Sequence, residues 1–255
     1  MNTQNRPYFR STDYIGSTRY RKLSMASLVI AIDGPAASGK GTLARKIAER
    51  LGFAYLDTGA IYRATAHYLL RELHADASDE TAAIKAAEYV RDHLTAQMLA
   101  SPELRVEDVA SATSKIAANA KVREILLDAQ REYAKAPPEI NGVMAGGAIL
   151  DGRDIGTVVC PKADVKLYVT ASTEVRAQRR FEEMSAKGEA VTYDDILADM
   201  KERDQRDSER TIAPLKPASD AFTIDTSNQS PKDVLSRAID IIRGHLAEQV
   251  AKNAP

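Results

Sequence analysis

The stretch Leu28-Val-Ile-Ala-Ile-Asp-Gly-Pro-Ala-Ala-Ser-Gly-Lys-Gly-Thr42 predicts the fold of this chain. Its first part, residues 28–33, is a nearly continuous apolar run, which indicates a strand buried in a parallel sheet. The loop that follows has a glycine, four further residues and then Gly-Lys, and residues 39–51 have the pattern of a helix. A strand, a loop of this composition and a helix, in this order, predict a phosphate-binding loop, or P-loop.

Each part of this loop suits a polyphosphate such as that of ATP. Glycines let the backbone wrap around a phosphate group with its N–H groups pointing inward, and the N-terminus of the next helix adds a positive dipole end. Lys40 supplies a positive charge for the β- and γ-phosphates. We therefore expect ATP to bind to Gly34, Pro35, Ala36, Ala37, Ser38, Gly39, Lys40, Gly41 and Thr42.

The residue after the lysine is Gly41, where many P-loop proteins have a serine or threonine that binds Mg²⁺. Thr42 comes one position later. We therefore expect the Mg²⁺ that accompanies ATP to be held mostly by water, by ATP oxygens and by a distant carboxylate. The sequence Gly-Lys-Gly-Thr is typical of nucleoside monophosphate kinases, and the Asn-Lys-x-Asp signature for guanine is absent from the chain.

The rest of the chain alternates short apolar runs with helical patterns, which predicts an α/β fold. We expect a parallel five-stranded sheet flanked by helices, with ligands bound outside the carboxyl ends of its strands. Strands are expected, after the first, over residues 53–56, 148–150, 165–169 and 221–224. Helices are expected over residues 60–73, 81–97, 107–116, 120–134, 176–187 and 194–209, and from Pro231 onward.

The composition narrows the class of protein. The chain has 255 residues, 44% of them hydrophobic, and a formal net charge of −1, which fits a single folded domain over residues 28–250 and argues against a nucleic-acid-binding surface. No stretch approaches the roughly 18 apolar residues of a membrane span. The single cysteine excludes an internal disulfide and favours a reducing compartment. We expect a cytoplasmic monomer without nucleic-acid or membrane partners.

Residues 1–27 differ from the rest, with five basic residues and one acidic residue. They have neither helical periodicity nor the apolar segment of a secretory signal. We expect a disordered basic extension here. An RNA-binding role for this extension is the alternative.

Further motifs lie at the expected strand ends and late in the chain. Asp-Thr-Gly-Ala-Ile-Tyr-Arg spans 57–63, Asp-Gly-Arg-Asp-Ile-Gly-Thr spans 151–157, and Arg-Asp-Gln-Arg-Asp-Ser-Glu-Arg spans 203–210. Together with the P-loop, these motifs resemble those of the bacterial cytidylate kinase family, from about Leu28 to the C-terminal helix. The resemblance implies transfer of the γ-phosphoryl group of ATP to CMP or dCMP, giving CDP or dCDP.

The resemblance also implies a role for each residue of the acceptor site. Arg63, Arg153 and Arg210 correspond to arginines around the acceptor phosphate, a dianion that several guanidinium groups are needed to neutralise and align. Arg203 and Asp207 correspond to residues on the sugar. The expected CMP site is completed by Thr58 and by three residues at the cytosine edge, Ser114, Arg123 and Asp154.

Asp154 suits cytosine because a carboxylate accepts from the N4 amino group and would face the O4 acceptor of uracil. Asp151 is expected to orient Mg²⁺ through water. The acceptor phosphate is already ionised, so we expect in-line transfer by positioning and charge stabilisation, without a strong base. The expected catalytic residues are Lys40, Asp151, Arg153 and Arg210.

Two segments are expected to surround the substrates. By resemblance, residues 174–210 form a mobile lid over ATP, with Arg176 and Arg180 reaching the nucleotide. The alternative for both arginines is a solvated helix face paired with neighbouring glutamates. Residues 75–135 form a small helical insert for the nucleoside monophosphate, and the short stretch between Gln97 and Glu107 argues against a β-rich insert.

Two alternative functions stay open at this level. The first is a kinase for another nucleoside monophosphate, UMP or AMP. The second is a non-catalytic regulator that uses the P-loop as a nucleotide sensor, although a regulator would not explain three acceptor arginines.

Overall fold

The computed structural model describes residues 28–252, and the expected basic extension lies outside these residues. Five strands form one parallel sheet in the order β2-β3-β1-β4-β5. The strands are β1 (Leu28–Asp33), β2 (Ala54–Asp57), β3 (Gly147–Gly152), β4 (Val165–Thr170) and β5 (Phe222–Asp225). The predicted α/β fold with a parallel five-stranded sheet is therefore confirmed.

Helices cover both faces of this sheet because successive side chains of a buried strand point to opposite faces. Ile30 and Ile32 of β1 pack with α1 (Lys40–Leu51) and α9 (Pro231–Lys252) on one face. Ala31, between them, packs on the other face with a larger helical group. That group contains α2 (Thr58–Arg71), α3 (Glu80–Asp92), α4 (Ala96–Ala100), α5 (Glu107–Ile116) and α6 (Ala120–Lys135).

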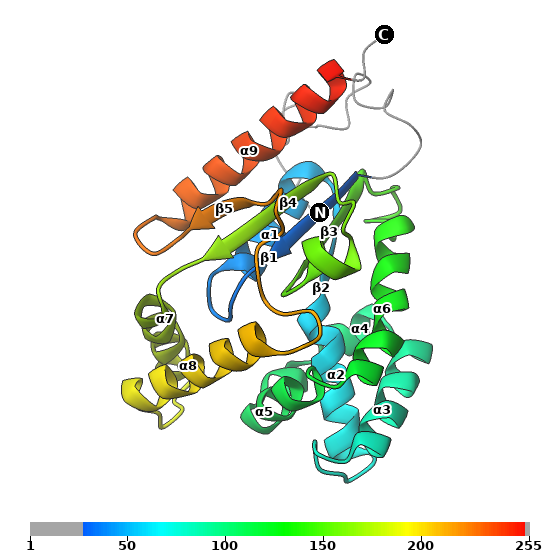
Figure 1. Ribbon diagram of the computed structural model, residues 1–255, viewed down its shortest axis with the longest axis vertical. Helices are drawn as coiled ribbons and strands as arrows, with labels where there is room; N and C mark the ends of the chain where they lie inside the picture. Colours follow the sequence, from blue (N-terminus) through cyan, green and yellow to red (C-terminus); the bar gives the residue numbers. More distant parts are fainter. Residues whose placement is uncertain (1–27, 253–255) are drawn as a thin grey trace, which may run out of the picture.

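Two groups of helices extend past the carboxyl edge of the sheet, one on each side (Figure 1). On one side lie α2 to α6, joined by the short 3₁₀ helix η1 (Pro102–Arg105). On the other side lies a hairpin of α7 (Thr173–Ala186) and α8 (Tyr193–Glu209). The hairpin has a small apolar cluster of its own, with Ala177, Met184, Ile196 and Met200. The residues expected to form the lid are thus a separate helical hairpin.

One local prediction was wrong, and one element was not predicted. The helix expected over residues 81–97 ends at Asp92, and α4 begins at Ala96, because the Thr95 hydroxyl accepts the Met98 N–H and starts a new helix. After β3 in the sequence, the chain forms a five-residue π-helix, η2 (Ile155–Val159), which the sequence pattern did not predict. Residues 58–146, all of them described, contain helices and one isolated β-bridge, Ile140–Val143, so the insert is helical as predicted.

Candidate active site

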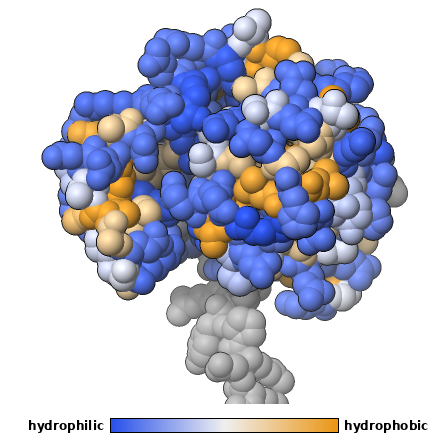
Figure 2. All heavy atoms as spheres, turned by 90° about the horizontal axis from the view of Figure 1, so that it is seen from below, coloured by the Kyte–Doolittle hydropathy of each residue, from blue (hydrophilic) through white to orange (hydrophobic). Residues whose placement is uncertain are grey.

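Two cavities open at the carboxyl edge of the sheet and meet at Lys40. The smaller, of about 270 Å³, lies among the ends of β2 and β3, α2, α5 and α8. The larger, of about 700 Å³, lies between the P-loop, α5 and the α7–α8 hairpin. Seen from this edge, the molecular surface is mostly hydrophilic (Figure 2). Two neighbouring cavities that share Lys40 can hold two ligands that react with each other beside this lysine.

The P-loop adopts a conformation that depends on its small residues. Ala37 and Gly39 have positive φ angles of 57° and 87°, the left-handed conformation that glycine adopts most readily. A Cβ atom on Gly34 would lie 2.0 Å from the Val169 carbonyl oxygen, so only glycine fits against β4. Gly39 starts α1 without a side-chain hydrogen bond to the helix N-terminus, which leaves backbone N–H groups for an anion.

The electrostatics of Lys40 indicate a site built for negative charge. Burial, helped by the nearby Arg153 guanidinium, lowers the pKa of Lys40 to about 7, while the charges of Asp151 and Asp57 act in the opposite direction. The Lys40 ammonium donates to the Pro35 carbonyl oxygen at 3.3 Å. A bound polyphosphate would stabilise the charged form of this lysine, because an adjacent anion offsets the cost of burying the ammonium.

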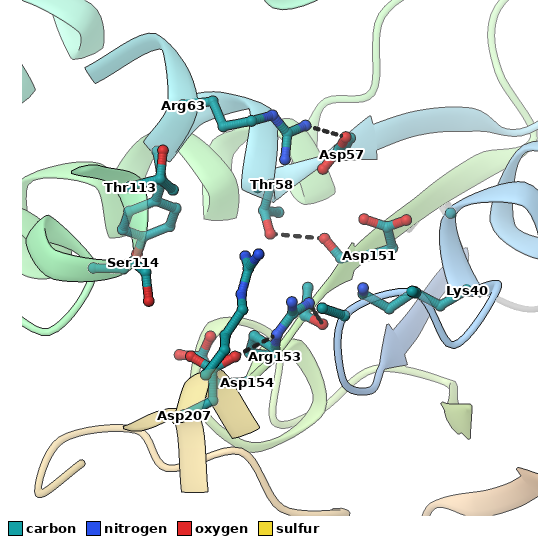
Figure 3. Close-up of a pocket in the computed structure, with 18 of the residues that line it drawn as sticks. Lys40, Asp57, Thr58, Arg63, Thr113, Ser114, Asp151, Arg153, Asp154 and Asp207 are labelled. Atoms are coloured by element: carbon teal, nitrogen blue, oxygen red, sulfur yellow. Dashed lines mark hydrogen bonds and ion pairs between the residues drawn. The ribbon is translucent and has the colours of Figure 1, made fainter. Parts of the chain in front are cut away.

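Two carboxylates accompany the lysine at the ends of β2 and β3 (Figure 3). Burial and the charge of Asp57 raise the pKa of Asp151 to about 6. Burial acts to raise the pKa of Asp57, but Arg63, which binds it at 2.6 Å, acts together with Lys40 and the Ala60 N–H group to lower that pKa below its usual range. The Tyr55 hydroxyl donates to Asp151 Oδ2 at 3.0 Å and orients that carboxylate.

The arginines predicted to bind the acceptor phosphate and the sugar lie together around the smaller cavity, and they come from three parts of the chain. Arg63 comes from α2, Arg153 follows β3, Arg203 lies on α8, and Arg210 follows α8. Arg153 Nε binds the Asp207 carboxylate at 2.9 Å, and Arg210 Nη2 is 4.0 Å from Asp154 Oδ1. The structure therefore brings the predicted phosphate-binding and sugar-binding residues into one cavity.

Three of these arginines have buried N–H groups that lack a hydrogen-bond partner within residues 28–252. The atoms are Arg63 Nε, Arg203 Nε and Arg210 Nη2. Burial and the charge of Arg153 lower the pKa of Arg203 to about 10, so the protein itself stabilises this charge poorly. Unpaired buried donors are costly, and an anion with several oxygens would satisfy them.

The residues predicted at the cytosine edge also line the smaller cavity. Arg123 and Asp154 form a buried ion pair, and Arg123 lies 5.5 Å from the centre of the Tyr62 ring. The Ser114 hydroxyl accepts from Arg206 Nη1 at 2.8 Å. Asp154 is therefore held by an arginine from α6, which fixes the direction of its remaining acceptor positions.

Some predicted residues lie elsewhere or have other contacts. The Thr58 hydroxyl donates to the Asp151 carbonyl oxygen at 2.7 Å, so it holds the end of β3. Arg180 lines the larger cavity and is 3.3 Å from Glu183, the kind of glutamate pair that was the alternative. Gly34, Pro35 and Ser38 line neither cavity.

Arg176 is a different case, because it lies outside both cavities. Its side chain is buried and donates to the Ala171 and Ala36 carbonyl oxygens at 2.9 and 3.3 Å. Both oxygens of Asp204 accept from it, at 3.0 and 2.6 Å. The expected contact with ATP thus finds no support in this arrangement, and neither does a solvated helix face. Arg176 instead joins the P-loop to both helices of the hairpin.

Thr226 forms a second link between the P-loop and the hairpin, and the sequence did not predict it. The Thr226 hydroxyl donates to the Ser38 carbonyl oxygen at 3.0 Å and accepts from Arg179 Nη1 at 2.9 Å. Arg179 Nη2 also donates to the Thr226 carbonyl oxygen at 2.6 Å. A lone threonine after a short strand carries no sequence signal of such a role, because its partners lie 188 and 47 residues away.

A P-loop that faces a cluster of arginines across a shared lysine defines a P-loop phosphotransferase. Comparison with known proteins narrows this class. The family model described as cytidylate kinase matches residues 30–244, and the chain therefore belongs to the cytidylate kinase family.

Curated cytidylate kinases are similar in sequence to this chain over most of their length. The cytidylate kinase of Paramagnetospirillum magneticum is 50% identical over 216 residues, covering 85% of this chain and 98% of the relative. The cytidylate kinase of Rhodospirillum rubrum is 49% identical, covering 84% and 97%. That of Bradyrhizobium diazoefficiens is 47% identical, covering 84% and 95%.

The buried arginine donors generate a prediction about stability. We expect Arg203→Met to stabilise the unliganded protein by about 1 kcal/mol or more, because methionine fills the space without a buried charge. Urea unfolding in a buffer without phosphate or sulfate measures this change. Lys201→Met, on the exposed side of the same helix, is the control and should change stability by less than about 0.5 kcal/mol. A loss of stability in Arg203→Met would show that this guanidinium serves the fold.

Proposed function

We propose that this protein transfers the γ-phosphoryl group of ATP to CMP or dCMP. The observation that carries the proposal is the set of buried arginine N–H groups without partners in residues 28–252, on arginines that line the smaller cavity together with Lys40. A nucleoside monophosphate brings a phosphate dianion to that position. Membership of the cytidylate kinase family supports a cytidine nucleotide as the acceptor.

The two cavities suit the two substrates. ATP would occupy the larger cavity, where the P-loop, Thr42 and Arg180 line the wall. CMP would occupy the smaller cavity, with its phosphate toward Arg63, Arg153 and Arg210. Lys40 lines both cavities, so the transferred group would pass beside it.

The chemistry then rests on charge and position. The acceptor oxygen is already ionised, so the residues need only align it with the γ-phosphorus and stabilise charge on the transferred group. Lys40 is placed to do this because it lines both cavities, and Arg153 lines the smaller cavity beside it. Donors that are fixed before the reaction cost no reorganisation during it.

The residues near Lys40 also fit a Mg²⁺ ion bound with ATP. The Asp151 carboxylate is buried and would gain from a cation, and a Cβ atom on Gly41 would come within 3.0 Å of its Oδ2 atom. Glycine thus leaves space between the P-loop and this carboxylate. Mg²⁺ usually keeps several waters and binds substrate phosphates beside one or two carboxylates, so Asp151 would orient the ion through water while ATP oxygens hold it. The ion would neutralise charge on the β- and γ-phosphates.

The cysteine content and net charge bear on the compartment and the assembly of the protein. We propose a cytoplasmic monomer that uses small-molecule substrates, on the basis of one unpaired cysteine and a near-neutral net charge of −1. Within the described part of the chain, no helix is both long and apolar enough to cross a membrane.

Base selection gives the first test of the proposed function. ADP release with CMP, dCMP, UMP or AMP should show CMP and dCMP as the preferred acceptors. We expect Asp154→Asn to lower kcat/KM for CMP by about tenfold or more and to narrow the preference for CMP over UMP, because an asparagine amide can donate to O4 of uracil.

The control is Asp240→Asn, an exposed aspartate on α9, which should leave the preference unchanged. Equal losses for CMP and UMP in Asp154→Asn would show that Asp154 only supports Arg123. A wild-type protein that prefers UMP or AMP would exclude the proposed acceptor.

Closure of the α7–α8 hairpin gives a second test. The hairpin lines the larger cavity and packs through its own apolar cluster, so it can move as a unit. We expect amide hydrogen exchange over residues 173–209 to slow when CMP and a non-hydrolysable ATP analogue are both present. Exchange in α9, which packs against the sheet beside α1 and lines neither cavity, is the internal reference. Unchanged exchange over the hairpin would rule out a lid.

A further inference from the structure

The last residue of β1, Asp33, is a buried carboxylate that the proposed chemistry does not use. Asp33 is only 4% exposed to solvent. Asp33 Oδ1 accepts the Ile155 N–H at 2.7 Å, and Oδ2 accepts the Gly156 N–H at 2.7 Å. Both oxygens therefore bind the first turn of the π-helix η2, 122 and 123 residues further along the chain.

This contact replaces the cap that a helix usually receives from the residue before it. Asp154 precedes η2 but makes no side-chain hydrogen bond to its N-terminus. Burial raises the pKa of Asp33 to about 6, while the Gly156 and Ile155 N–H groups act to lower it. A Cβ atom on Gly156 would lie 3.3 Å from Asp33 Oδ2 and 3.1 Å from Lys166 Cδ, so glycine allows this close approach.

A second contact holds the chain on the other side of the acceptor motif. The Thr58 hydroxyl binds the Asp151 carbonyl oxygen at 2.7 Å, and a Cβ atom on Gly152 would lie 2.6 Å from that hydroxyl. Arg153 and Asp154 lie between these anchors, directly after Gly152. Their side chains line the smaller cavity, so any shift of the anchors would move both.

We propose that Asp33 is a positioning residue for the acceptor site, which holds Arg153 and Asp154 in place by binding the backbone directly after them. This inference rests on the proposed function, because it assigns a role in acceptor binding. Asp33 also directly precedes Gly34 of the P-loop. The end of one strand thus sets the relative position of the donor loop and the acceptor motif.

Asp33→Asn tests the proposal with the smallest change of shape. An asparagine side chain keeps one acceptor oxygen but turns an NH₂ group toward the second N–H, so one of the two hydrogen bonds is lost. We expect KM for CMP to rise about tenfold or more, with KM for ATP within about twofold of wild type. Initial-rate kinetics over both substrates measure these constants.

Asp164→Asn is the matched control. Asp164 Oδ2 also accepts a backbone N–H, that of Val29 at 2.8 Å, but at the opposite end of β1 and away from both cavities. This variant should leave both KM values within about twofold of wild type. A merely structural role for Asp33 would instead lower the active fraction and kcat while leaving both KM values unchanged.

Gly156→Ala keeps the Asp33 carboxylate but places a Cβ atom 3.3 Å from its Oδ2 atom, a tight contact that pushes the carboxylate and the turn apart. It should raise KM for CMP in the same way, and it decides the question if Asp33→Asn does not fold. An unchanged KM for CMP, or equal changes for CMP and ATP, would overturn the proposal. A wild-type protein that does not phosphorylate CMP would instead refute the proposed function, so the two failures are distinguishable.

Discussion

Five guanidinium groups and one ammonium group line the smaller cavity at the carboxyl edge of the sheet, and the protein neutralises them only in part. Asp57 and Asp207 bind Arg63 and Arg153, but other arginine N–H groups there have no partner within residues 28–252. Burial of unpaired cationic donors is costly unless a ligand completes their hydrogen bonds. The unliganded site is therefore costly in stability, and the proposed acceptor phosphate would offset that cost.

The parallel sheet makes this concentration of charge feasible. All five strands run the same way, so the residues that follow β1, β2 and β3 meet at one edge. β1 continues into the P-loop, and its last residue, Asp33, binds the start of η2, which follows β3 in the sequence. Arg176 and Thr226 tie the same loop to the hairpin and to the loop after β5. Donor and acceptor groups are thus fixed by one central strand and its contacts.

Much of this arrangement could be predicted from local sequence, because the P-loop and the arginine–aspartate motifs have characteristic spacing. The strands were predicted to within about two residues, since buried apolar runs are a strong local signal. Other features depend on tertiary contacts between distant residues. Asp33 has no sequence signal for binding η2, and Arg176 has the pattern of a surface arginine although it is buried. The break between α3 and α4 comes from one threonine cap inside a continuous helical pattern.

The central claim is that the arginine cluster exists to bind the acceptor phosphate. Isothermal titration calorimetry of CMP against cytidine tests it directly, because the two ligands differ only in the phosphate group. The account predicts that cytidine binds at least about 100-fold more weakly, since the dianion completes several charge-assisted hydrogen bonds worth roughly 1.5–3 kcal/mol each. Affinities for CMP and cytidine within about threefold of each other would contradict it.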